Sequence, residues 1–219
     1  MNKTIFIMAL LCLSVSLSVS LSAQFRLGVK ATTGFANTPN LSKKFVSLSP
    51  LEIYNISVGA SETRQSFGMS IQGGNDLLFV MADGLYTKSS QVFESTTFGQ
   101  REAILDPAVE YSYSSSNVRL IGMAGVKLKG FRFGVGPEFS LVLDEKETLS
   151  ELNGFEKVNS NVVGGFNFLI GYEINNHLQV DLRHTRYFNS IGSNYQFDGV
   201  PLDLKSSPGM FELTLGFYL

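Results

Sequence analysis

Apolar residues alternate with polar or small residues along most of this chain, and after Gln24 no apolar run approaches the roughly 18 residues of a transmembrane helix. The pattern is clearest over Phe211–Leu219, where every second side chain is apolar and Glu212, Thr214 and Gly216 lie between. Successive side chains of a β-strand point to opposite faces. The sequence therefore predicts strands with one apolar and one polar face.

The same alternation predicts eight strands, most of them about ten residues long. They lie at residues 25–32, 66–72, 77–86, 118–128, 131–141, 166–174, 178–183 and 211–219. Strand 77–86 is apolar on both sides, so the pattern does not determine which face it presents. Short Gly- or Asn-containing turns are expected at 73–76, 129–130 and 175–176, because these residues tolerate the positive φ of tight hairpins. The other four connections, 35–64, 88–116, 144–160 and 189–209, are expected to be long loops.

The length of the strands and their aromatic residues favour a barrel that spans a membrane over a soluble periplasmic barrel of the lipocalin kind. About ten residues are enough to cross a bilayer at a tilt near 45°. Aromatic residues are expected to form one girdle at the short-turn end (Phe25, Phe131, Tyr172 and Phe217) and another at the long-loop end (Phe67, Phe139, Phe166 and Phe211).

The polar face carries charges of both signs among many glycines, and a narrow interior requires such charges to be paired. The candidates for interior ion pairs are Arg26, Lys30, Arg119, Arg132, Glu138, Glu173, Asp181, Arg183 and Glu212. Lys127 shares their face. The predicted fold is all-β: an eight-stranded antiparallel transmembrane β-barrel, an up-and-down meander with short periplasmic turns and long extracellular loops. Side chains fill a barrel of this size, so no wide pore is expected.

The N-terminus is interpreted as a secretory signal peptide. Lys3 precedes an apolar region, and Ser22-Ala23 offers small residues for cleavage. We expect residues 1–23 to be removed and residues 24–219 to form the barrel domain. The alternative is an uncleaved anchor helix, for which the serine-rich apolar region is short. Cleavage would also remove Cys12, the only cysteine, and with it any disulfide or thiolate metal site.

Three segments resemble the PorT-like outer-membrane β-barrel proteins of Bacteroidota. They are Phe25–Lys30 after Ser-Ala-Gln, the hairpin Gly171–Tyr187, and the closing segment Phe211–Leu219. The resemblance implies an outer-membrane location and an eight-stranded barrel. The name-giving member is associated with a system that secretes proteins across the outer membrane, so an accessory role in secretion is one alternative function.

Candidate chemistry is sparse. His184 stands beside Thr185, and Ser190 follows nearby, a loose match to the nucleophile and base of a lipid-modifying barrel enzyme, which is a second alternative. We expect instead a rim histidine. Asp181 and Arg183 suggest a proton relay or, more simply, an interior ion pair. The acidic segment 144–157 could hold divalent cations or be a solvated loop.

The expected function is that of an integral outer-membrane protein with a structural or surface-interaction role. No catalysis, catalytic residue, cofactor or metal is expected. The expected partners are outer-membrane lipid and lipopolysaccharide, and proteins that meet the extracellular loops. The net charge of −2 provides no basic surface for nucleic acid.

Overall fold

The computed structural model describes residues 25–36, 42–48, 51–98, 104–148, 155–157, 162–175, 177–188, 195–197, 200–202 and 209–219. The segment interpreted as a signal peptide lies outside these residues. Within them, no helix is both long enough and apolar enough to cross a membrane.

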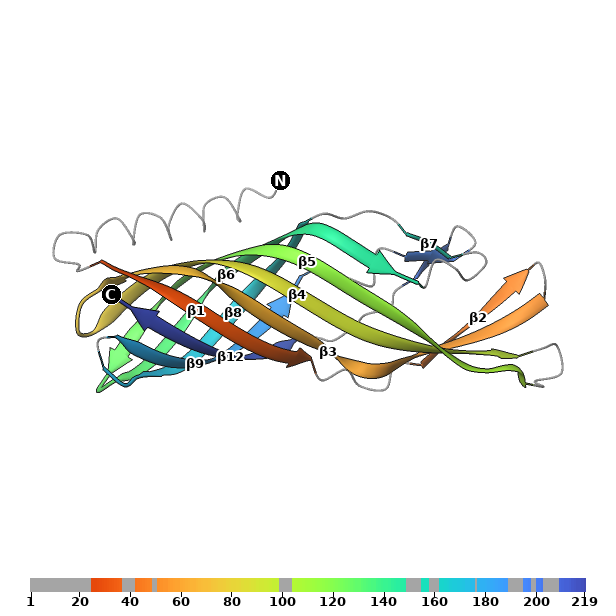
Figure 1. Ribbon diagram of the computed structural model, residues 1–219, viewed down its shortest axis with the longest axis horizontal. Coiled ribbons are helices and arrows are strands. Elements are labelled where there is room, and N and C mark those ends of the chain that lie inside the picture. Colours follow the sequence, from red (N-terminus) through yellow and green to blue (C-terminus); the bar gives the residue numbers. More distant parts are fainter. Residues whose placement is uncertain are drawn as a thin grey trace.

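Eight strands form a closed antiparallel ring in the order β1, β12, β9, β8, β6, β5, β4 and β3, and β3 pairs again with β1. These strands are β1 (Arg26–Ala36), β3 (Leu51–Gly74), β4 (Leu78–Phe98), β5 (Ile104–Leu128), β6 (Phe131–Glu147), β8 (Val162–Glu173), β9 (Leu178–Tyr187) and β12 (Met210–Tyr218). The first and last strands close the barrel by pairing over Gly28↔Tyr218 to Ala36↔Met210. The predicted eight-stranded meander is therefore confirmed (Figure 1).

The short turns have the geometry that their residues dictate. Between β5 and β6, Lys129 and Gly130 both have positive φ, as a two-residue hairpin of this kind requires. Between β3 and β4, the side-chain oxygen of Asn75 accepts hydrogen bonds from the backbone N–H groups of Leu77 and Leu78 at 2.9 and 2.7 Å. Asn175 makes the same pattern before β9. The residues within each turn thus determine the geometry of all three turns at one end of the barrel.

The strands at the opposite end are much longer than predicted. β3, β4, β5 and β6 contain 24, 21, 25 and 17 residues. The expectation of loops at 35–64 and 88–116 is therefore wrong: β2 (Ser42–Leu48) pairs with β3 there, and β4 pairs with β5 as far as Phe98↔Ile104. In 88–116 the cause is composition, because Thr, Tyr and Val favour strands but polar residues on both faces remove the apolar alternation.

The longer strands carry the sheet past the end of the barrel. Figure 1 shows β3, β4 and β5 continuing beyond the ring and β2 alongside β3 at the far end. Three short strands, β7 (Phe155–Lys157), β10 (Tyr195–Phe197) and β11 (Val200–Leu202), form a separate small sheet. We call the part of β3, β4 and β5 that lies beyond the ring, together with β2, the extension.

The outer surface of the ring is apolar. Along β1, β6, β8 and β12, alternate residues point outward and expose apolar side chains. For example, Phe168 is 48% exposed and Leu215 is 51% exposed. Phe25, which directly precedes β1, and Phe35 on β1 are both exposed and ten residue steps apart. At about 3.3 Å per residue and a tilt near 40–45°, this separation gives a belt about 25 Å tall. The eight residues predicted for the aromatic girdles all face outward or are half-exposed. The nine charged residues predicted for interior ion pairs face inward, as in a transmembrane barrel.

The structure also settles the orientation of strand 77–86. Phe79, Met81, Asp83 and Leu85 point inward and are at most 4% exposed. The apolar members of this set join Ile121, Met123 and Leu169 in a cluster inside the barrel. The interior is therefore polar on part of its wall and apolar on the wall made by β4, β5 and β8.

We expect Leu215→Arg to lower the free energy of unfolding by about 2–4 kcal/mol, because it places a guanidinium at mid-belt on the outer face of β12. The matched variant Ile174→Arg, beside a short turn, should cost only about 0–1 kcal/mol. Urea titration of the detergent-refolded protein, followed by the shift in gel migration on heating, measures both. Equal costs for the two variants would contradict an apolar belt in contact with acyl chains.

Candidate functional site

Charged side chains fill the barrel interior in three groups. The group nearest the short turns, the rim cluster, consists of Arg26, Lys127 and Glu173. Arg26 Nη2 lies 2.8 Å from Glu173 Oε1, and Lys127 Nζ lies 3.1 Å from Glu173 Oε2. Their side chains keep 11–18% exposure, so this cluster meets solvent at the mouth of the barrel.

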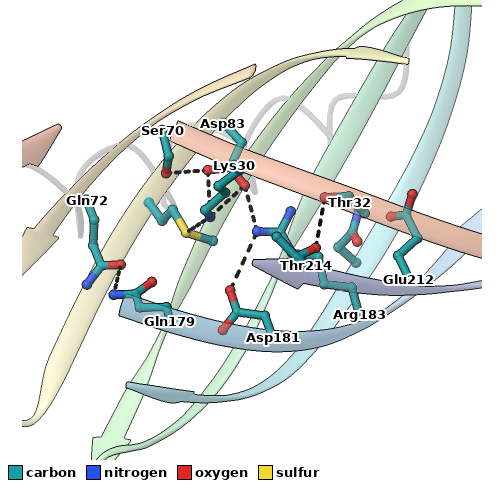
Figure 2. A network of polar contacts seen from close by, with 12 residues as sticks. Lys30, Thr32, Ser70, Gln72, Asp83, Gln179, Asp181, Arg183, Glu212 and Thr214 are labelled. Atoms are coloured by element: carbon teal, nitrogen blue, oxygen red, sulfur yellow. Dashed lines mark hydrogen bonds and ion pairs between the residues drawn. The ribbon is translucent and has the colours of Figure 1, made fainter. Parts of the chain in front are cut away.

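The second group, the proximal cluster, consists of Lys30, Asp83, Arg132, Asp181 and Arg183, and Asp83 is its centre. Lys30 Nζ donates to both carboxylate oxygens of Asp83 at 2.9 and 3.0 Å, and Arg183 Nη2 donates to Oδ2 at 2.7 Å. The hydroxyl of Ser70 donates to Oδ1 at 2.6 Å. Figure 2 shows these groups converging from β1, β3, β4 and β9, so one carboxylate ties four strands together.

The rest of the proximal cluster spans the barrel on the short-turn side. Arg132 Nη1 lies 3.2 Å from Asp181 Oδ1 and also donates to the side-chain oxygen of Gln179. Gln179 Nε2 in turn donates to Gln72 Oε1 at 3.1 Å (Figure 2). The guanidinium of Arg132 stands 4.6 Å from the centre of the Phe79 ring, where a cation–π contact joins the polar and apolar walls.

The third group, the distal cluster, consists of Glu62, Arg64, Arg119, Glu138 and Glu212, and Arg119 is its centre. Arg119 bonds Glu138 through Nε and Nη2 at 2.7 and 2.9 Å. It bonds Glu212 through Nη1 and Nη2 at 2.6 and 2.8 Å. This guanidinium therefore makes two bidentate contacts, the strongest arrangement open to an arginine and a carboxylate.

Arg64 adds the outer layer of the distal cluster. Its Nη2 lies 3.2 Å from Glu62 Oε1, and its Nη1 lies 3.9 Å from Glu212 Oε1 and also bonds the hydroxyl of Tyr187. That hydroxyl donates to Glu138 Oε1 at 3.1 Å. Asn167 also bonds Glu138, so β8 and β9 are held to the same cluster.

The two buried clusters carry opposite net charges, so their charges cancel. The proximal cluster has three basic and two acidic groups, and the distal cluster has two basic and three acidic groups. All ten residues are at most 5% exposed. A buried charge without a partner costs several kcal/mol, so near-neutrality of the interior is a condition of its stability. The arrangement blocks the interior with mutually bonded side chains.

The structure places all nine residues predicted for interior ion pairs inside the barrel. Asp181 and Arg183, singled out as a pair, are 3.8 Å apart, whereas Arg183 makes its short contact with Asp83. Sequence reasoning missed Asp83, because the facing of its strand was undetermined. It also missed Glu62 and Arg64, which lie in a segment expected to be a loop.

Two of the residues considered for catalysis are neighbours on β9 but point to opposite faces of the strand. His184 faces outward on β9, whereas Thr185 faces inward, where its hydroxyl donates to Asn167 Oδ1 at 2.9 Å. Ser190 lies outside the described residues. In the acidic segment, Glu145 Oε1 accepts a hydrogen bond from Tyr113 at 2.8 Å. Within the described ranges, no three Asp, Glu, His or Cys side chains are grouped so that they could hold a metal ion.

Comparison with protein families and with curated proteins finds no match. Among solved structures, the outer membrane protein OprG from Pseudomonas aeruginosa is similar to this chain. The two are 11% identical, the alignment covers 89% of this chain and 95% of OprG, and the TM-score is 0.46. The closed ring of paired strands, rather than this similarity, establishes the fold.

Proposed function

We propose that the protein is an integral outer-membrane protein whose barrel is a closed anchor for the extension at the cell surface. The apolar belt of about 25 Å matches the outward-facing band of outer-membrane barrels. The short turns would face the periplasm, and the extension would face outward. The proposal assigns the protein a binding or structural role rather than catalysis.

The observation that carries this proposal is the contrast between the two parts of the long strands. Inside the ring, buried ion pairs cross-link the strands and block the interior. Beyond it, β4 and β5 remain paired as far as Phe98↔Ile104, whereas β6 ends at Glu147 opposite Tyr113. A protein that only has to be embedded in the membrane does not require a paired sheet that continues past the ring. Such a sheet presents a stable surface to a partner.

Two single-cysteine variants test the orientation. Glu110 is exposed on the part of β5 that lies beyond β6, and Asp76 is exposed at the short turn after β3. A membrane-impermeant maleimide applied to intact cells should label Glu110→Cys but not Asp76→Cys, which should react only after the cells are permeabilised. Both variants should stay in the outer-membrane fraction and keep heat-modifiable migration. Labelling of Asp76→Cys in intact cells, or a soluble wild-type protein, would contradict the proposal.

An accessory role in protein secretion is the second candidate, and only the resemblance to PorT-like proteins supports it. In that role the extension would contact another component of the secretion apparatus. Co-purification of the detergent-solubilised protein with such components would support it. Normal secretion in a deletion strain would count against it while leaving the anchor proposal intact.

A further inference from the structure

The apolar outer face of β9 changes character near the long-strand end of the ring. Leu178, Val180 and Leu182 point outward, and the next outward residues are His184 and Arg186. Neither residue belongs to the rim, proximal or distal cluster. This pair places a permanent cation and an imidazole on the outer face of β9, next to the aliphatic side chains of Leu178, Val180 and Leu182.

Arg186 lies among apolar side chains. It pairs across β8 and β9 with Phe166, and beyond it Phe188 is 73% exposed and Val162 is 53% exposed. The guanidinium itself is exposed, and it has no hydrogen bond or ion pair with any described residue. A guanidinium at the edge of the hydrocarbon region costs free energy unless it reaches an anion or water at the headgroup level.

His184 supplies a second polar group on the same face. Its ring centroid lies 4.5 Å from that of Phe211, and a Cβ added at Gly209 would come within 2.8 Å of His184 Nε2, so neighbouring groups restrict the ring. Its Nδ1 is buried and has no hydrogen-bond partner, so an anion outside the barrel meets this ring only at Nε2. Residues two apart on a strand are about 7 Å apart. One tetrahedral anion can therefore accept hydrogen bonds from both side chains.

We propose that Arg186 and His184 bind the phosphate of an anionic lipid in the outer leaflet. This inference rests on the proposed membrane location. A lipid fits better than a free anion because the donors lie beside Phe166 and Phe211, where acyl chains would pack. The guanidinium provides the charge and the fork of donors that phosphate prefers. The site gives the barrel a fixed lipid neighbour on the β8–β9–β12 wall.

The test compares binding of diphosphorylated lipid A with binding of its dephosphorylated form, using native mass spectrometry of the detergent-purified barrel. The variants are Arg186→Gln, His184→Ala and the control Lys88→Gln. Lys88 is an exposed base on β4, four strands from β9 and hence on the opposite wall. We expect Arg186→Gln to weaken binding about tenfold. His184→Ala should weaken it severalfold, and Lys88→Gln should leave it unchanged.

Three outcomes would overturn the inference. Equal losses for Lys88→Gln and Arg186→Gln would show general attraction between charges. Equal binding of both lipid A forms by the wild type would remove the phosphate from the argument. Competition by millimolar inorganic phosphate would point to a free anion rather than a lipid. Heat-modifiable migration of every variant shows that the barrel is intact, and membrane fractionation of the wild type reports separately on the proposed function.

Discussion

Arg119→Met should lower the free energy of unfolding by about 3–5 kcal/mol. The reason lies in the groups left behind. Glu138 and Glu212 would stay in a closed interior and lose both bidentate contacts with the guanidinium. Circular dichroism during urea titration measures the loss, and it suits this chain because the sequence has no tryptophan.

A triple variant separates pairing from packing. Arg119→Met combined with Glu138→Gln and Glu212→Gln removes the two orphaned charges and retains their volume. We expect it to recover most of the stability lost in the single variant, because replacing a whole buried ion pair is often close to neutral. If the triple variant were as unstable as the single one, the size and shape of Arg119 rather than its charge would be responsible.

Gly136→Val should destabilise the barrel by about 3 kcal/mol or more, or prevent its closure. Gly136 is buried on β6, and a Cβ there would collide with the backbone of Gly122 and lie 2.8 Å from the Cα of Met123. Backbone atoms of a paired strand cannot move aside as a flexible side chain can. The expected result is a strong fall in the fraction of protein that shows heat-modifiable migration after refolding.

Gly122→Ala is the matched control. It changes a glycine on the adjacent strand, but a Cβ at Gly122 meets nothing within 4 Å. We expect its stability to stay within about 0.5 kcal/mol of the wild type. A comparable loss in this variant would mean that the conformational freedom of glycine in β5, and not the close approach of two strands, explains the effect at Gly136.

The sequence was most informative where a strand meets lipid on one face and the interior on the other. In β12, alternation alone predicted the outward position of Phe211 and the inward position of Glu212, and both are confirmed. Glycine and asparagine likewise identified the three short turns. These features depend on interactions within one strand or turn, so they can be read locally.

Alternation alone did not predict which side chains of β4 point inward. Phe79 points inward because the neighbouring strands β5 and β6 leave room for it: Cβ atoms added at Gly125 or Gly134 would lie within 3 Å of its ring. That complementarity joins three strands and leaves no trace in the sequence of any one of them. The inward position of Asp83, and hence the centre of the proximal cluster, was hidden for the same reason.

The extension was missed for a different physical cause. Beyond the belt neither face of a strand meets hydrocarbon, so Ser95, Thr96 and Thr97 follow one another without the contrast on which sequence analysis depends. The pairing of β4 with β5 is nevertheless continuous with the ring. A polar stretch between two membrane strands can therefore be either a loop or a strand.

The seam between β1 and β12 has a consequence for how the protein reaches its final state. Gly28 pairs with Tyr218, so the ring depends on a contact between the first and the last strand of the barrel. Contacts so distant in sequence form slowly, and until this one forms, two rows of backbone amides and carbonyls have no partner. Before the ring closes, the unpaired edges of β1 and β12 are thus open to wrong pairings. A truncation that removes β12 would leave the edge of β1 permanently unpaired.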